Sequence, residues 1–328
     1  MPEDTLSGNT LDETAELADA ETDIVYALTC SKDLRTCFAA RTTGLYRSTD
    51  AGESWHYAYG SLELESPLPT TSVVLTPNYD GDEHATLFAG VPGGVLRSLD
   101  GGETWAATVL DSPPPAVSAL AISPNFVEDG VVLAATTEDG IFRSATRGTH
   151  WARWNFGLLD LNVFSLAISP AFAVDETLMA GVESGVFRST NGGRAWREVE
   201  LSVGFEPVMS LALSPHYDED GTVLAGTETQ GLLFSDDDGE SWVRLGADII
   251  KDPVNGLLLS PDFPDQPTVL VLMESGLWLS RDCGRDWVKL EQAPAGLTAV
   301  CAPAGLMPGA SLLVGCVGGE VVRLELDV

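Results

Sequence analysis

Carboxylates are the residues of this sequence whose types and spacing could support chemistry. Four glutamates stand at matching places in four consecutive sequence units, two or three residues before the glycine that begins a predicted strand: Glu138, Glu183, Glu228 and Glu274. Such a half-ring would attract a basic peptide, an amine or a metal ion. Glu183 and Glu228, from adjacent units, could also form the carboxylate pair, about 5 to 10 Å apart, that cleaves a glycosidic bond. Solvated loop glutamates without a ligand are the alternative.

A second candidate site is the apolar segment WARWNFGLLDLN. Four of its side chains lie in a predicted connection between units and should be exposed: Trp154, Phe156, Leu158 and Leu159. Loops seldom leave so much apolar surface uncovered. The segment therefore either packs into a neighbouring unit or anchors a partner.

The elements that position these residues follow from a repeat. A dodecapeptide such as GVFRSTNGGRAW occurs six times. We call the eight residues from its serine to its tryptophan the repeat hairpin; their pattern is S-x-D-x-G-x-x-W, with Asn or Thr in place of Asp in two copies. Its first serines are 50, 46, 45, 46 and 45 residues apart: Ser48, Ser98, Ser144, Ser189, Ser235 and Ser280. A period in the mid-forties over nearly the whole chain predicts an array of equivalent units.

Each period reads as four strands. In the fourth unit these are residues 163–170, 177–182, 185–190 and 195–201, and the first is apolar enough to be an innermost strand covered on both faces. Seven such innermost strands predict an all-β, seven-bladed β-propeller of four-stranded antiparallel blades over residues 23–328. Residues 1–22 are expected to be an acidic segment. Either 13–19 supply the fourth strand that the seventh unit lacks, or the segment is a disordered tail.

Turn chemistry explains the repeat hairpin. A short carboxylate or amide accepts hydrogen bonds from its own turn, glycine permits the turn conformation, and tryptophan covers the hairpin. The residues expected to act in this structural way are Asp50, Asp100, Asn191, Asp237 and Asp282, with Trp55, Trp105, Trp151, Trp196, Trp242 and Trp287; Thr146 replaces the acid in the third copy. Aromatic residues that follow the innermost strands should pack between blades: Tyr79, Phe126, Phe172, Tyr217 and Phe263.

The repeat hairpins resemble the Asp-box, also called the bacterial neuraminidase repeat. This resemblance implies two readings. One is a non-catalytic platform similar to the single-propeller assembly factors of photosynthetic bacteria and to sortilin-like receptors. The other is a glycosidase, since sialidases and xyloglucan-cleaving enzymes carry the same repeat. In such families the ligand sites lie on the face formed by the strand 2–3 turns and the connections between blades, which is opposite the repeat hairpins.

The arginines disfavour a sialidase. Sialidases, by the same resemblance, hold the sugar carboxylate with clustered arginines, but Arg41 is the only arginine in the strand 2–3 turns. Four others recur at one place in the third strand and are expected to be structural: Arg47, Arg97, Arg143 and Arg188. Xyloglucan-cleaving relatives usually form their cleft between two propellers, whereas one is predicted here. No catalytic residue is assigned, and a protein-binding platform is the favoured function.

Composition narrows the partners. Seventeen basic and 49 acidic residues give a formal net charge of -32, which disfavours nucleic acid and anionic membranes as partners. The charge either keeps the protein soluble or favours a partner with a basic surface. No 18-residue apolar run is present. The N-terminal residues have seven acids and no base, unlike a secretory signal, so a cytoplasmic location is expected.

Metal and disulfide sites are not expected. The five cysteines are odd in number and contain no C-x-x-C pair, which favours reduced thiols over a disulfide framework or a zinc site. The four histidines stand in separate units without ligand spacing, and no cofactor motif occurs.

Overall fold

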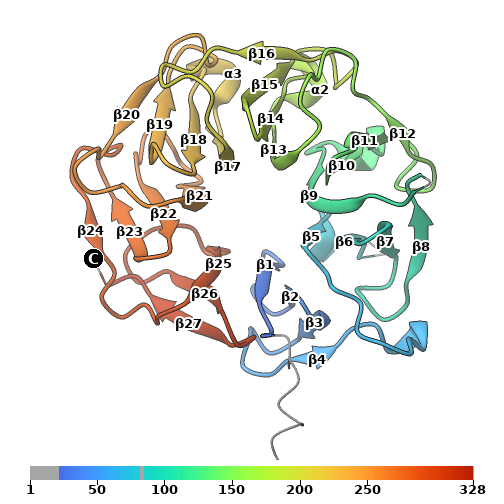
Figure 1. The fold of residues 1–328 in the computed structure, drawn as a ribbon. Helices are drawn as coiled ribbons and strands as arrows, with labels where there is room; N and C mark the ends of the chain where they lie inside the picture. Colours follow the sequence, from blue (N-terminus) through green and yellow to red (C-terminus); the bar gives the residue numbers. More distant parts are fainter. Residues whose placement is uncertain (1–21, 82–84, 112, 328) are drawn as a thin grey trace, which may run out of the picture.

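The structure is a computed structural model that describes residues 22–81, 85–111 and 113–327. Seven antiparallel sheets surround a central channel, each a meander whose first strand is innermost (Figure 1). The chain is therefore a seven-bladed β-propeller, as the repeat predicted. No helix among the described residues is long and apolar enough to cross a bilayer.

The strands follow the repeat blade by blade. Blade 1 contains β1 (Val25–Cys30), β2 (Cys37–Arg41), β3 (Gly44–Ser48) and β4 (His56–Tyr57). Blade 2 contains β5 (Ser72–Leu75), β6 (Leu87–Val91), β7 (Gly94–Ser98) and β8 (Ala106–Val109). Blade 3 contains β9 (Ala116–Ile122), β10 (Val132–Thr137), β11 (Gly140–Ser144) and β12 (Ala152–Arg153). Blade 4 contains β13 (Val163–Ile168), β14 (Leu178–Val182), β15 (Gly185–Ser189) and β16 (Arg197–Val199). Blade 5 contains β17 (Val208–Leu213), β18 (Val223–Thr227), β19 (Leu232–Ser235) and β20 (Val243–Leu245).

Blade 6 contains β21 (Val254–Leu259), β22 (Val269–Met273), β23 (Gly276–Ser280) and β24 (Val288–Lys289). Blade 7 contains β25 (Leu297–Cys301), β26 (Ser311–Cys316) and β27 (Val321–Glu325), and these three strands are its sheet within the described residues. The helical turns are η1 (Gly60–Leu62), η2 (Tyr79–Gly81), α1 (Phe126–Asp129), α2 (Phe172–Asp175) and α3 (Tyr217–Asp220).

The core lies around the second strand of each blade, which corrects one expectation. Every residue of β14 is buried, whereas the innermost strand β13 alternates between buried and half-buried side chains. The reason is geometric: the first strand borders the channel and the second is covered by the two adjacent blades. Full apolar cover therefore belongs to the second strand, and the prediction that the innermost strand is covered on both faces was wrong.

Aromatic side chains join consecutive blades, as predicted. Phe126 of blade 3 packs edge to face on Phe88 of blade 2 with ring centroids 5.7 Å apart. Tyr79 of blade 2 meets Phe38 of blade 1 in the same way at 6.4 Å. Edge-to-face contact of this kind stabilises a pair beyond simple burial. These aromatic residues are therefore parts of the core.

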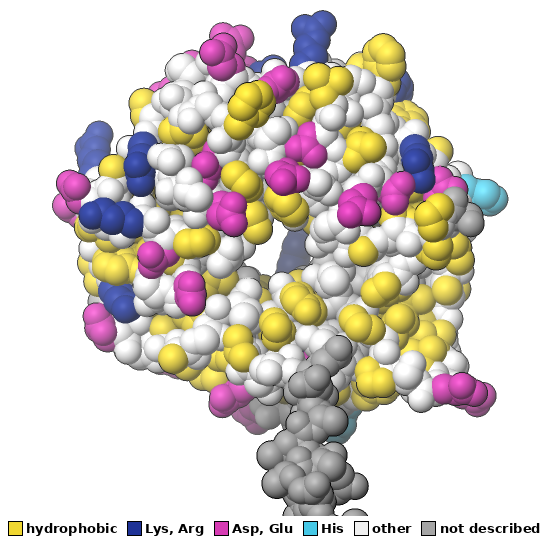
Figure 2. Space-filling view, in the orientation of Figure 1, with side chains coloured by type: hydrophobic (Ala, Val, Ile, Leu, Met, Phe, Trp, Pro, Cys, Tyr) yellow, Lys and Arg dark blue, Asp and Glu magenta, His cyan; other side chains and the backbone are white. Residues whose placement is uncertain are grey.

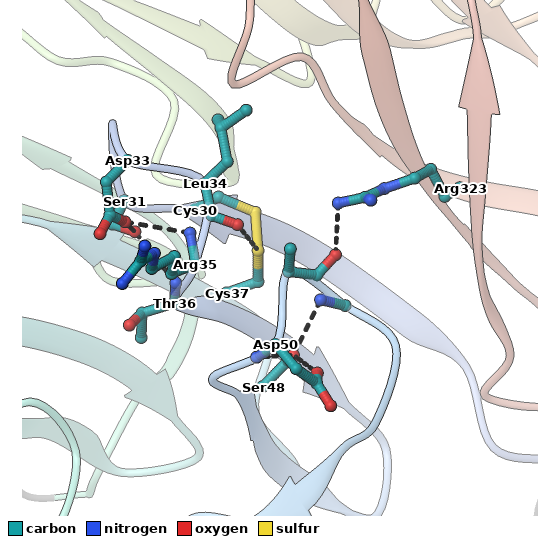
Figure 3. The surroundings of a disulfide bond; sticks show 12 residues. Cys30, Ser31, Asp33, Leu34, Arg35, Thr36, Cys37, Ser48, Asp50 and Arg323 are labelled. Atoms are coloured by element: carbon teal, nitrogen blue, oxygen red, sulfur yellow. Dashed lines mark hydrogen bonds between the residues drawn. A yellow bond between two sulfur atoms is a disulfide. The ribbon is translucent and has the colours of Figure 1, made fainter.

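The repeated arginines also join blades. Arg97 donates to the backbone oxygen of Arg147 at 2.7 Å, and Arg188 donates to that of Asp238 at 2.7 Å. Both acceptors are the fourth residue of the next blade's repeat hairpin. Arg323 makes the same contact from blade 7 to blade 1, at 2.6 Å from the Ala51 oxygen (Figure 3). A guanidinium has several donors on a long stem, which suits it to reach across a blade interface.

A second set of contacts links the innermost strands. Hydroxyl groups near the channel donate to a carbonyl of the next blade, from Thr71 to Val117 at 2.6 Å, Ser118 to Val163 at 2.5 Å, Ser165 to Val208 at 3.3 Å and Ser210 to Val254 at 2.8 Å. Thr71 and Ser118 stand one residue earlier on their strands than Ser165 and Ser210 do. In blades 6, 7 and 1 the later position holds Gly256, Ala299 and Ala27, and the earlier one holds Asn255, Thr298 and Tyr26. The Thr298 hydroxyl donates within its own blade, to the Gly315 oxygen at 3.2 Å. The hydroxyl links therefore run from blade 2 to blade 6.

The repeat hairpins are held by hydrogen bonds within their own turns. In blade 5 the Ser235 hydroxyl accepts the Gly239 N–H at 2.9 Å, and Asp237 accepts the Ser241 N–H at 2.8 Å and its hydroxyl at 2.6 Å. These hydrogen bonds, first that of the Ser241 hydroxyl, lower the pKa of Asp237 to about 2. Asn191 accepts the Ala195 N–H at 2.9 Å, so an amide serves equally well as the acceptor.

The tryptophans of the hairpins divide into two groups. Four are buried, namely Trp105, Trp196, Trp242 and Trp287, and two are half-buried, namely Trp55 and Trp151. The indole N–H of Trp242 donates to the Gly239 oxygen of its own turn, and that of Trp196 donates to Trp154 of the previous blade at 2.8 Å. Trp55 is the exception, because its buried indole N–H has no hydrogen-bond partner among the described residues.

The ring closes between blades 7 and 1. Ile24 forms a β-bridge with Val317, the Gly318 N–H donates to the Asp23 oxygen at 2.6 Å, and β1 contacts β25 and β26. The segment 13–19, one of the two interpretations of the N-terminal region, lies outside the described residues.

A disulfide corrects the expectation of reduced thiols. Cys30 ends β1 and Cys37 begins β2, so the antiparallel register places them opposite each other with Cα atoms 4.1 Å apart, and the two are bonded (Figure 3). The spacing rules for disulfide and metal motifs do not detect two cysteines that lie opposite each other on the paired strands of a hairpin. Cys283, Cys301 and Cys316 are free thiols. Burial raises the pKa of Cys301 to about 12, which keeps that thiol protonated.

Candidate functional site

The candidate site lies on the face formed by the strand 2–3 turns and the connections between blades, which we call the connection face. Figures 1 and 2 look onto it. Figure 2 shows acidic and hydrophobic side chains interspersed around the mouth of the channel. All four predicted glutamates begin strand 2–3 turns here and are exposed.

Glu138 and Glu183 are brought together by Asn162. This amide accepts the Glu138 N–H at 3.0 Å and donates its own N–H to the Glu183 carboxylate at 2.7 Å. Asn162 stands in the connection that enters blade 4, one residue before β13. One side chain thus fixes the turns of two adjacent blades and holds the Glu183 carboxylate in place.

The other two predicted glutamates are held differently. The Glu228 N–H donates to the Pro207 oxygen at 3.0 Å, which anchors the backbone of its turn to the connection that enters blade 5. Glu274 lines a separate hollow of about 220 Å³ together with Lys289 and Glu291. The role of the four glutamates as a ligand site stays a prediction.

Two carboxylates that the sequence analysis did not single out hold the strand 2–3 turns of blades 4 and 5. Glu206 is buried and accepts the backbone N–H groups of Thr229 and Gln230, and the Thr229 hydroxyl at 2.9 Å. Asp160 accepts the Ser184 N–H at 2.8 Å. The sequence signal that could have found them is an acidic residue two or three positions before an innermost strand. Both carboxylates are engaged by hydrogen-bond donors of the turns, so we interpret them as structural residues.

The segment 154–159 is partly packed into the blades and partly exposed. Leu158 is buried in the core of blades 3 and 4. Trp154 is half-buried, with the Arg143 guanidinium 4.3 Å from its ring centroid and that of Arg194 at 5.7 Å. Burial, together with the charge of Arg194, lowers the pKa of Arg143. Because cations cover the Trp154 ring, it is a structural residue and is not an open surface for a ligand.

Three apolar side chains on this face are left in solvent. Phe156 is 80% exposed, Leu159 is 81% exposed and Phe205, which the sequence analysis did not single out, is 83% exposed. Phe205 belongs to the connection after β16 and lines a hollow of about 460 Å³ with Ser184. We use the name platform for five residues of the strand 2–3 turns of blades 3 and 4 and of the connections that follow these blades: Phe156, Leu159, Phe205, Glu138 and Glu183.

Metal chemistry has no support at these positions. Within residues 22–81, 85–111 and 113–327, no group of three or more histidine, cysteine, aspartate or glutamate side chains is arranged to hold a metal ion.

Comparison with known proteins gives structural relatives only. No protein-family model and no curated protein matches the chain. It resembles a structure described as YCF48 bound to D1 peptide, with a TM-score of 0.69, 18% identity and coverage of 93% of this chain and 94% of that one. YCF48 from Cyanidioschyzon merolae has a TM-score of 0.63, 15% identity and coverage of 94% and 97%. The GH74 enzyme of Niastella koreensis has a TM-score of 0.73, 14% identity and coverage of 94% and 53%.

These likenesses establish the seven-bladed propeller and no more, because a fold is shared by many functions. The chain spans nearly the whole of the two YCF48 structures and about half of the GH74 enzyme.

Proposed function

We propose that this protein is a non-catalytic platform, or assembly factor, that binds a protein partner with a basic surface through the connection face. We further propose that its repeat hairpins are Asp-boxes whose work is structural. The observation that carries the proposal is the platform itself: three apolar side chains more than three-quarters exposed, together with the Glu183 carboxylate and the Glu138 backbone, which Asn162 holds.

The physical argument rests on what such a surface does in water. Isolated apolar residues are common on surfaces, but a group on two neighbouring connections marks an interaction site. Carboxylates beside it favour a cationic partner and speed encounter. The structure titled YCF48 bound to D1 peptide supports a peptide or protein as the ligand of a propeller of this size.

The test is an affinity capture from the native lysate. It compares the wild type with the triple variant Phe156→Ser, Leu159→Ser, Phe205→Ser. The matched control is Val174→Ser, since Val174 is 88% exposed but lies in α2, in a strand 1–2 turn on the opposite face. We expect the triple variant alone to lose a partner that the other two retain. Equal retention by all three would refute the platform.

A glycoside hydrolase is the alternative, favoured by the likeness to the GH74 fold and by the proximity of the Glu138 and Glu183 turns. It predicts hydrolysis of a neutral glycan such as xyloglucan that disappears in Glu183→Gln or Glu228→Gln. Retention of the protein partner by the same variants would separate the two functions.

The cytoplasmic location expected from the sequence stays a prediction. The Cys30–Cys37 disulfide is more typical of an oxidising compartment. Thiol labelling of the protein in intact cells would test it, because a reduced pair reacts and a bonded pair does not.

A further inference from the structure

The outer edge of blade 4 carries a groove that the platform does not account for. Strand β16 forms this edge and lies at the top of Figure 1. One hollow beside it, of about 470 Å³, is lined by the repeat hairpins of blades 4 and 5, and the other, of about 460 Å³, extends toward Phe205. Residues Glu198, Val199 and Glu200 line both hollows. The two therefore form one groove along the strand.

The free edge of β16 has main-chain groups available for a further strand. β16 pairs with β15, with Arg197 opposite Arg188 and Val199 opposite Val186, and no strand of the described residues covers its other edge. The Trp196 N–H already points away from β15, because it donates to the Phe156 oxygen at 2.8 Å. Main-chain groups alternate in direction along a strand, so the N–H groups of Glu198 and Glu200 also point outward.

The walls of the groove set the chemistry of a ligand. Glu198, Glu200 and Glu240 bring three carboxylates. Two cations, Arg188 and Arg197, also line the wall, and the guanidinium of Arg188 already donates to the Asp238 backbone oxygen. At the end near the connection face the walls are apolar.

We propose that the free edge of β16 binds an extended basic segment of a protein by strand addition. The segment forms main-chain hydrogen bonds with Glu198 and Glu200, as in other strand-addition complexes. Its lysine or arginine side chains face the carboxylates of the groove. Its apolar side chains pack against Val199, Leu201 and Phe205. This inference rests on the proposed function, because Phe205 also belongs to the platform.

The shortness of β16 fits this mode. An exposed edge of three residues is too short to pair readily with another sheet, which protects the free protein from aggregation. A ligand must add side-chain contacts to make the pairing stable. The two hollows along the strand supply those contacts, and so they select a partner by charge and by alternation of residue type.

The direct test uses a fluorescein-labelled hexapeptide of alternating lysine and valine, with a peptide of three lysines followed by three valines as control. Glu198→Pro removes the outward N–H, which an edge strand tolerates, and Glu198→Ala removes the carboxylate but keeps the N–H. Measured by fluorescence anisotropy, the alternating peptide should bind better than its control. Its affinity should fall roughly tenfold in Glu198→Pro, the loss expected for one or two main-chain hydrogen bonds. Glu198→Ala should lose less, and its loss should shrink in high salt.

Hydrogen exchange of the wild type gives a second readout that needs no variant. Saturating alternating peptide should slow exchange of the Glu198 and Glu200 amides. Equal affinity for the two peptides, equal binding by Glu198→Pro, or unchanged exchange at both amides would overturn strand addition. If Glu198→Pro still captures the lysate partner and the triple variant does not, strand addition at β16 is refuted and partner binding by the platform is supported. If neither variant loses a partner, the proposed function fails.

Discussion

The tryptophans of the repeat hairpins allow a quantitative test of what holds the ring together. Trp196 is 3% exposed, and its indole N–H donates to the Trp154 oxygen of blade 3 at 2.8 Å. Replacing Trp196 by alanine removes the ring, leaves a cavity and leaves the Trp154 carbonyl oxygen without its hydrogen-bond donor. Large-to-small changes of this kind cost about 3 to 5 kcal/mol of the free energy of unfolding. Trp196→Phe keeps most of the packing, and we expect it to cost about 1 to 2 kcal/mol, chiefly the hydrogen bond.

Trp55 is the matched comparison in the same hairpin of blade 1. Its ring is half-buried and its N–H has no partner among the described residues, so Trp55→Ala should cost about 1 to 2 kcal/mol, less than half the loss at Trp196. Urea denaturation followed by far-ultraviolet circular dichroism measures both without relying on tryptophan fluorescence. A loss below 1 kcal/mol in Trp196→Ala, or equal losses at the two positions, would refute the view that these rings stabilise the blades through burial and contact with the previous blade.

Three further predictions concern the disulfide, acid and the N-terminal segment. The double variant Cys30→Ser, Cys37→Ser should lower the free energy of unfolding by about 2.5 kcal/mol, the entropy of the short loop that the bond closes, and reductant should destabilise the wild type but not the variant in urea. The lowered pKa of Asp237 makes its contribution full above pH about 4 and lost as pH falls toward about 2, so Asp237→Asn should lose less stability than the wild type over that interval in acid titrations followed by circular dichroism. Deleting residues 1–21 should lower the urea midpoint and increase acrylamide quenching of Trp55 if they supply a fourth strand to blade 7; an unchanged midpoint would favour a tail.

The predictable part of the fold is the part written in the repeat. Serine, aspartate, glycine and tryptophan recur in register, and their turn chemistry is local, so the hairpins, the blade number and the structural arginines could all be predicted. The disulfide could not, because its two cysteines are brought together by a strand register that has to be known first. The burial of the strands was misassigned for a related reason. Apolar content alone does not say which of two apolar strands borders the channel.

The candidate site was only partly predictable. Position in the repeat correctly placed the four glutamates on one face, but not the contact through Asn162, which depends on the path of a connection. Trp154 and Phe156 look alike in sequence, yet Arg143 and Arg194 cover the first and nothing described covers the second. Phe205 was missed because a single aromatic residue in the eight-residue connection between β16 and β17 carries no pattern. Exposure is a property of the assembled ring and is not encoded in one segment.

The hydroxyl links around the channel divide the ring into two unequal parts. From blade 2 to blade 6 the hydroxyl of a serine or threonine links each innermost strand to the next. The remaining interfaces have no such link among the described residues, and their hydrogen bonds include those of Arg281 to Leu306, Gly318 to Asp23 and Arg323 to Ala51. A closed ring should open first at its weakest blade interface, so thermal opening should begin at one of the three interfaces between blades 6 and 2. The platform and the groove lie on the linked blades 2 to 6, and they should keep their structure while the weaker interface opens locally.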